Sequence, residues 1–203
     1  MLSETRYAIS RGPVYSGGMD TLFHGVLGAA ACSNVGLPGA LSKRGCDRRW
    51  FAEWTLWAAF FFGVFPDIAS LGIHFATNFF AGNGVRWTGI PDFVFFLYRV
   101  THSLLGIALG YSLLVLWKRA LWLPALAWPL HVAVDLPTHG DGVFRTPIFW
   151  PFSSAGFVGW SWWQHPRLFY SAWVFAIGLW SVSAIFRAAR VRRCSSASGS
   201  RAE

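Results

Sequence analysis

Long apolar stretches and short polar connections alternate along the chain. The apolar stretches cover residues 21–41, 50–66, 93–117, 120–136 and 168–186. A helix needs about 20 apolar residues to cross a bilayer, and the third and fifth stretches meet this length comfortably. The second and fourth are slightly short, and Ser33, Asn34 and Pro38 interrupt the first. The pattern predicts an all-α fold, a polytopic transmembrane helical bundle with about five spanning helices.

The remaining segments are too short or too polar to cross a bilayer. Residues 68–80 are apolar but short, so we expect an interfacial or re-entrant segment there. Residues 1–18 form a polar N-terminal extension without the apolar core of a cleavable signal peptide. Residues 187–203 are basic and then rich in small polar residues, which predicts a disordered cytoplasmic tail. The transmembrane domain is therefore expected at residues 19–186, and the functional chain could begin at Met19.

The composition is that of a membrane protein. Of the 203 residues, 54% are hydrophobic and only 13% are charged, whereas globular proteins carry about 25% charged residues. The 13 Trp and 19 Phe residues exceed what one soluble core of this size needs, and Trp is enriched where membranes meet water. The three cysteines (Cys32, Cys46 and Cys194) have no CxxC spacing, so they indicate neither a disulfide framework nor a thiolate zinc site.

The positive charge is concentrated in the connections. The net charge is +8, and eleven of the 17 basic residues lie in residues 42–49, residues 118–119 and the tail after residue 186. They form no stripe with interleaved aromatic residues, which argues against nucleic-acid binding. Basic connections are typical of the cytoplasmic side of membrane proteins, so we expect these three there. The N-terminus, residues 67–92 and residues 137–167 are then expected on the outer side.

Five ionisable residues lie within or at the ends of the apolar stretches. They are His24, Asp67, His102, His131 and Asp135. Counted from the expected cytoplasmic ends of their helices, they lie about 17 to 27 Å into a hydrocarbon core that is about 30 Å thick. All five therefore fall in the outer half of the bilayer, although they come from four predicted helices. Ionisable groups at membrane depth are costly and mark functional sites, so we expect one shared site.

The segment "HVAVD" has the spacing of a metal-binding pair. His131 and Asp135 are four residues apart, so they share one helix face, and both can reach one zinc ion with bonds of about 2.0–2.2 Å. A buried His–Asp hydrogen bond is the alternative for this pair. Taken singly, Asp67 could cap a helix, His102 could bond to a carbonyl group and His24 could be interfacial. The agreement of all five in depth favours a shared metal site.

Other polar residues lead to less specific expectations. His139 and Asp141 follow in the Gly-rich turn "THGDG", where they could complete a second metal position, act as acid and base, or be solvated. Arg99 and Arg145 could bind an anionic group such as a phosphate. The two remaining histidines are expected to be surface or packing residues, namely His74 and His165.

In their order, these pieces resemble the YdjM-like family of bacterial inner-membrane proteins, which are described as membrane-bound metal-dependent hydrolases. The resemblance covers about residues 19–152 and rests on "HGVLG", "PD" after an apolar helix, "RVTHSLLG", "HVAVD" and a Gly-rich turn leading to "WPF". Many members have a His immediately before the Arg of the third motif, whereas this chain has Tyr98. The resemblance implies an inner-membrane location and a metal-dependent hydrolytic activity.

The order of the candidate ligands also resembles that of the all-helical zinc-dependent phospholipase C and nuclease families. This second resemblance implies six metal ligands, namely His24, Asp67, His102, His131, Asp135 and His139. The later HxxxE element that completes the three-zinc site of those enzymes is missing from this chain. One or two zinc ions are therefore expected.

Together, the residues and the resemblances favour a zinc-dependent hydrolase. It would act at the outer membrane face on a phosphoester or a lipid-linked substrate. The ion would activate a water molecule, Asp135 or Asp67 would accept the proton, and Arg99 would bind the anionic group of the substrate. Membrane lipids are the expected partners, and nucleic acid is not.

Three other functions could use the same residues. A transporter or ion pathway would also need ionisable groups in the inner half of the bundle, where only Glu53 lies near the end. A non-enzymatic membrane protein would use the cluster for interhelical hydrogen bonds, which contribute about 0.6 kcal/mol each. Haem ligation by His102 and His131 is the third alternative.

Overall fold

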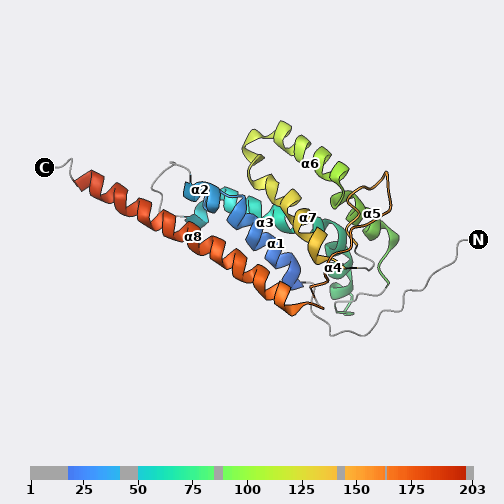
Figure 1. Ribbon diagram of the computed structural model, residues 1–203. Coiled ribbons are helices and arrows are strands. Elements are labelled where there is room, and N and C mark those ends of the chain that lie inside the picture. Colours follow the sequence, from blue (N-terminus) through green and yellow to red (C-terminus); the bar gives the residue numbers. More distant parts are fainter. Residues whose placement is uncertain (1–17, 42–49, 85–88, 141–144, 163, 200–203) are drawn as a thin grey trace, which may run out of the picture.

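The computed structural model describes residues 18–41, 50–84, 89–140, 145–162 and 164–199 (Figure 1). Within these residues the regular elements are helices, and the β-structure is one isolated antiparallel bridge between Thr146 and Phe157. The predicted all-α fold is therefore confirmed. Residues 1–17 of the predicted N-terminal extension lie outside the described residues.

Eight α-helices and four helical turns make up the regular structure of the described residues. The α-helices are α1 (Gly18–Ala31), α2 (Leu37–Leu41), α3 (Trp54–Asp67), α4 (Ile73–Phe80), α5 (Asp92–Thr101), α6 (Leu104–Trp117), α7 (Ala127–Thr138) and α8 (Pro166–Gly199). The helical turns are η1 (Trp50–Ala52), η2 (Ile68–Gly72), η3 (Arg119–Leu121) and η4 (Pro124–Leu126). In Figure 1, α8 runs as one long helix beside α1 and α2, while α6 lies beyond α7 on the opposite side of the bundle.

Fewer helices are long enough to cross a membrane than the sequence predicted. In the described residues, Trp54–Phe80 and Pro166–Arg192 are apolar helices of 27 residues each, and α5 with α6 forms a third span if the bent pair is counted as one. The prediction of about five spans is therefore wrong. The first apolar stretch is divided between the 14-residue α1 and the five-residue α2, because the first helix ends before Ser33. The fourth contains the 12-residue α7, which begins only after the proline-containing turn η4.

One continuous helix from Trp54 to Phe80 comprises α3, η2 and α4. The sequence predicted an apolar stretch that ends at residue 66 and a separate segment at residues 68–80, and this separation is wrong. Pro66 has no N–H group to donate, yet the chain continues past it through the π-helical turn η2. A wider turn of this kind lets a helix continue where its hydrogen-bond ladder is broken. Asp67 therefore lies about half-way along this helix rather than at its end.

The last helix is longer than expected, because α8 continues to Gly199. The sequence predicted a disordered tail from residue 187, and the structure corrects this for residues 187–199, which are helical. The segment "RAARVRR" is rich in Ala and Arg, two residues with high helix propensity. The helix can therefore continue after its apolar part has ended.

Small residues allow α1 and α3 to pack closely. A Cβ atom on Gly63 of α3 would overlap the carbonyl oxygen of His24, and a Cβ atom on Gly28 of α1 would lie 2.9 Å from the carbonyl oxygen of Ala59. Helix α7 packs against both of these helices. The three helices thereby enclose a centre that contains buried polar side chains.

Apolar side chains cover the outward faces of α6 and α8. Helix α6 contains no buried residue, and its Leu109, Leu113 and Leu116 are exposed. On α8, Val174 and Phe175 are exposed as well. Large exposed apolar surfaces mark contact with a membrane or a partner, and here they lie on apolar helices. The outer surface therefore agrees with the predicted membrane location.

Candidate metal centre

Five predicted site residues meet between four helical segments. His24 is on α1, Asp67 ends α3, His102 lies between α5 and α6, and His131 and Asp135 are on α7. The side chains of His102, His131 and Asp135 are 0% exposed. The Asp67 side chain is 16% exposed. The structure thus brings together residues that are more than one hundred positions apart in the sequence.

The bend between α5 and α6 positions His102. His102 is the C-cap residue that follows α5, and the Ser103 hydroxyl caps α6 by accepting a hydrogen bond from the Gly106 backbone N–H at 3.1 Å. A Cβ atom on Gly106 would overlap the Val100 carbonyl oxygen, so only glycine allows the two helix ends to approach this closely. The helix axes differ by 68°, and the His102 side chain is buried inside the bundle.

Three donor atoms form a nearly equilateral triangle. The Nε2 atoms of His102 and His131 are 3.3 Å apart, and the Asp135 Oδ2 atom lies 3.3 Å from the first and 3.2 Å from the second. Donor atoms on one tetrahedral zinc ion are separated by about 3.4 Å, so the triangle has the size of one face of such a site. The Asp67 Oδ1 atom lies farther out, 3.6 Å from His131 Nε2 and 3.9 Å from His102 Nε2.

Backbone carbonyl groups set the tautomers of both imidazoles. His131 Nδ1 lies 2.6 Å from the Gly63 carbonyl oxygen, and His102 Nδ1 lies 3.0 Å from the Tyr98 carbonyl oxygen. A carbonyl oxygen only accepts hydrogen bonds, so a proton on each Nδ1 is the tautomer that satisfies both carbonyl contacts; the Thr101 hydroxyl oxygen also lies 3.0 Å from His102 Nδ1. In the neutral imidazoles the two Nε2 atoms are then unprotonated, and they lie beside each other and beside the Asp135 carboxylate.

This arrangement of donor atoms fits a cation. Two nitrogen lone pairs and a carboxylate oxygen at 3.2–3.3 Å repel one another unless positive charge lies among them. Protonating both imidazoles would instead place two N–H groups head to head across 3.3 Å. One divalent ion bound by both nitrogens and the carboxylate satisfies all three atoms, and zinc accepts imidazole and carboxylate ligands. The residues present could therefore hold a metal ion.

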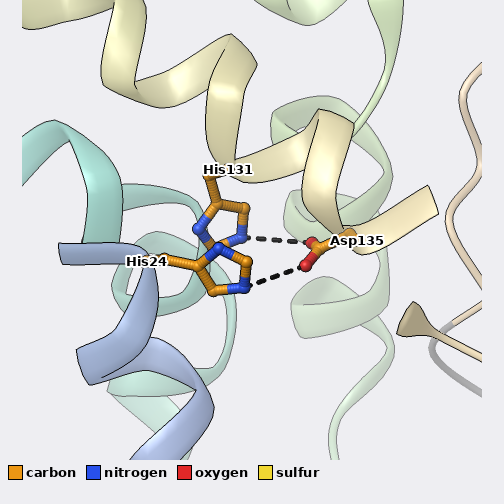
Figure 2. Close-up of side chains that lie close together, drawn as sticks. All are labelled: His24, His131 and Asp135. Atoms are coloured by element: carbon orange, nitrogen blue, oxygen red, sulfur yellow. Dashed lines mark ion pairs between the residues drawn. The ribbon is translucent and has the colours of Figure 1, made fainter. Parts of the chain in front are cut away.

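Two overlapping groups of side chains have ligand atoms close enough to share an ion. One comprises His24, His131 and Asp135, the other comprises Asp67, His102 and His131, and within each group the ligand atoms lie within 4.8 Å of one another. Figure 2 shows the first group, in which His24 and His131 direct ring nitrogens at different oxygen atoms of Asp135. His131 belongs to both groups and is the central residue of the site.

Comparison with known proteins now identifies a family. The family model described as YdjM inner membrane protein matches residues 19–199. The chain belongs to the YdjM inner membrane protein family. No curated protein and no solved structure matches it. The YdjM resemblance predicted from the short motifs is confirmed, whereas the likeness to phospholipase C and nuclease families stays a prediction.

In this YdjM family member, His139 and Tyr98 lie at the edge of the site. His139 Nδ1 is 3.9 Å from Asp135 Oδ2 and 3.4 Å from the Tyr98 hydroxyl oxygen. The Tyr98 ring stacks on the ring of His102, with centroids 4.0 Å apart. Tyr98, which departs from the expected family motif, thus contacts two of the predicted ligands. The ligand role of His139 itself stays a prediction.

Two residues of this YdjM site were not predicted. Thr21 Oγ1 donates a hydrogen bond to Asp67 Oδ2 at 2.7 Å, and Gly63 offers the carbonyl group to His131. Thr21 precedes His24 by three residues, so a search for polar residues on one helix face could have found it. The contact of Gly63 could not be found from the sequence, because every residue has a backbone carbonyl group.

The remaining predicted residues are placed as follows. Arg99 is exposed on α5 and Arg145 is half-buried, and the role of both in anion binding stays a prediction. His74 is buried on α4 and His165 is exposed, in agreement with packing and surface roles. Asp141 lies outside the described residues.

Proposed function

We propose that this YdjM family member is a membrane-embedded metal-dependent hydrolase. His102, His131 and Asp135 would bind one divalent ion, for which zinc is the best fit. The proposal is carried by the triangle of two imidazole nitrogens and one carboxylate oxygen, with edges of 3.2–3.3 Å and with both Nδ1 atoms engaged by carbonyl groups. Catalytic zinc sites have three protein ligands and one open position, which is the number that the triangle provides.

Asp67 is suited to act beside the open position. Its Oδ1 atom lies 3.6 and 3.9 Å from the two imidazoles, and its side chain is 16% exposed, whereas that of Asp135 is 0% exposed. When bound, a zinc ion supplies Lewis-acid polarisation of the substrate and activation of a water nucleophile. Asp67 can accept the proton of that water, while the Thr21 hydroxyl holds its other oxygen. Of the two predicted proton acceptors, the geometry favours Asp67.

The surroundings of the site support a lipid or lipid-linked phosphoester as the substrate. The site lies inside a bundle whose α6 and α8 expose apolar side chains, so a bilayer is the medium that suits its outer surface. Arg99 is exposed on α5, directly after the site residue Tyr98. An accessible guanidinium group suits a phosphate, while the tail of a lipid substrate would lie against the apolar helices.

Elemental analysis of detergent-purified protein tests the metal centre. We expect about one zinc ion per chain, which is removed by chelation and absent from His131→Ala, because that change removes a corner of the triangle. The control is His165→Ala, which changes an exposed histidine and should keep the metal. A His131→Ala protein that still retains one equivalent of metal would show that the assignment is wrong.

Hydrolysis is measured on the same preparations, with a chromogenic phosphodiester and with phospholipid vesicles as substrates. Wild type and His165→Ala should be active, His131→Ala inactive, and Asp67→Asn about 10²- to 10⁴-fold slower because it cannot accept a proton. Full metal content without any hydrolysis in the wild type would contradict the enzymatic part of the proposal for these substrates.

A further inference from the structure

Helix α1 contributes two polar side chains to the site, Thr21 and His24. Both contact carboxylate groups: Thr21 Oγ1 donates a hydrogen bond to Asp67 Oδ2 at 2.7 Å, and His24 Nε2 lies 3.0 Å from Asp135 Oδ1. The two residues are three positions apart, so they lie on the same face of α1. One helix therefore contacts both acidic residues of the proposed metal centre.

The two carboxylates divide their oxygen atoms in the same way. Asp135 turns Oδ2 toward the two imidazoles of the triangle, at 3.3 and 3.2 Å, and turns Oδ1 toward His24. Asp67 turns Oδ1 toward the same imidazoles and Oδ2 toward Thr21. In each case one oxygen faces the proposed ion and the other faces α1. Side chains that hold the outer oxygen of a ligating carboxylate, here Asp135, are a regular part of metal sites, and Thr21 holds the proton acceptor Asp67 in the same manner.

The position of the His24 ring argues against a bond to the same ion. The ring centroids of His24 and His131 are 3.9 Å apart with an interplanar angle of 35°, whereas those of His102 and His131 are 5.3 Å apart at 65°. Two imidazoles on one tetrahedral zinc ion have centroids about 5.2 Å apart, since each centroid lies about 3.2 Å from the ion. The second pair has this spacing, whereas the His24 ring is tilted against that of His131 and lies too close to it.

Among the described residues, a second ion beside His24 would have too few ligands. His131 Nδ1 is bonded to the Gly63 carbonyl oxygen, so His131 has one nitrogen for a metal, and the triangle already uses it. Of the group formed by His24, His131 and Asp135, only His24 and the outer oxygen of Asp135 would then remain. Zinc sites have at least three protein ligands, so this pair does not make one.

We propose that His24 and Thr21 are positioning residues, which orient the two carboxylates from outside the metal coordination. His24 contacts Asp135 Oδ1 through Nε2 at 3.0 Å, and Thr21 donates its hydroxyl hydrogen to Asp67. This inference rests on the proposed function, and it gives His24 a different role from the ligand role that the resemblance implied. It also reduces the centre to one ion.

X-ray absorption spectroscopy of the zinc-loaded protein counts the imidazole ligands directly. We expect two imidazoles in the wild type and also two in His24→Gln, in which the Gln side chain keeps an N–H donor for Asp135. Three imidazoles in the wild type, or a count that falls by one in His24→Gln, would overturn the assignment of His24. The matched control is His131→Gln, which should lose zinc.

Competition with a chelator measures zinc affinity in the same set of proteins. His24→Ala should bind zinc about 10- to 100-fold more weakly than the wild type, because His24 contacts the ligand Asp135, and His24→Gln should recover most of the affinity. Thr21→Val, which acts on the proton acceptor Asp67, should keep zinc and slow hydrolysis, and Thr21→Ser should recover most of the rate. Complete loss of zinc from a His24→Ala protein that still elutes as a folded species would contradict a positioning role. A wild type that binds no zinc refutes the metal centre itself, whereas zinc bound through three imidazoles refutes only this inference.

Discussion

Gly63 influences the site through its backbone alone. Its carbonyl oxygen accepts the hydrogen bond from His131 Nδ1 at 2.6 Å, which directs the other ring nitrogen toward the proposed ion. The absence of a side chain also allows α1 to approach, because a Cβ atom at this position would overlap the carbonyl oxygen of His24. One residue thus sets both the tautomer of a ligand and the spacing of two helices.

Gly63→Ala should therefore disturb stability and metal binding together. We expect a loss of about 1–3 kcal/mol in the free energy of unfolding from overpacking, together with weaker zinc retention, measured by thermal unfolding in detergent and by elemental analysis. Gly178→Ala on α8 is the matched control, because a Cβ atom there meets nothing within 4 Å. Equal behaviour of the two variants would contradict the close α1–α3 packing.

The sequence could predict which side chains gather but not what holds them. His131 and Asp135 were paired by their spacing, and depth in the bilayer added His24, Asp67 and His102. Thr21 was missed because one hydroxyl group near the end of an apolar stretch is unremarkable, and contacts made by backbone carbonyl groups are independent of residue type.

The break between α5 and α6 is the element that makes His102 available to the site. If residues 93–117 formed one uninterrupted helix, the helical repeat alone would decide on which side of that helix His102 lies. Instead, the Ser103 cap starts a new helix at an angle of 68° to the first, and His102 lies at the corner. The element boundary, rather than helix periodicity, decides where this imidazole lies.

Ser103→Ala should weaken this corner. Loss of the hydrogen bond from the Gly106 N–H to the Ser103 hydroxyl is expected to cost about 1 kcal/mol of stability and to lower zinc affinity, because His102 is the adjacent residue. Both effects are measured by thermal unfolding and chelator competition. Ser181→Ala, an exposed change on α8, should alter neither quantity. An unchanged zinc affinity in Ser103→Ala would show that the cap does not position His102.

The apolar pattern predicted the locations of the helices better than it predicted their ends. The second apolar stretch ends at residue 66, yet the helix continues through the π-helical turn η2 to Phe80. Conversely, the first and fourth apolar stretches contain helices too short to span. Hydrophobicity is a property of a whole stretch, whereas helix ends depend on single caps and turns.

At the scale of the whole molecule, basic and aromatic residues gather where α3 begins. Lys118 Nζ lies 5.6 Å from the centroid of the Trp54 ring, and the Arg187 guanidinium lies 5.9 Å from that of Trp50 and 5.8 Å from that of Trp180. Trp with Lys or Arg is typical of the surface where a membrane meets the cytoplasm. We therefore expect this end of the bundle on the cytoplasmic side.

Cysteine labelling tests this orientation. In a background with the three native cysteines replaced by Ser, Lys118→Cys should react with a membrane-impermeant maleimide only after the cells are opened. Asn83→Cys lies just beyond the other end of the Trp54–Phe80 helix, where Asn83 is exposed, and should react in intact cells. The reverse pattern of labelling would invert the topology.

Membrane character and the all-helical fold could be predicted from composition and apolar pattern, but the number of spans could not. The depth estimate still selected residues that meet. Counted along the observed helix from Trp54, Asp67 lies about 20 Å away, beyond the middle of a core that is about 30 Å thick. The depth of a residue in the bilayer changes little when a helix ends a few residues earlier or later. The number of spanning helices, in contrast, depends on where the helices end.

Because α7 supplies two of the three triangle corners, the site is completed late in synthesis. His24, Asp67 and His102 all leave the ribosome before His131 and Asp135. An ionisable side chain stranded in lipid costs about 2.5–3.5 kcal/mol on insertion scales. The earlier helices are therefore expected to remain beside the insertion machinery, with their polar faces shielded, until α7 joins them.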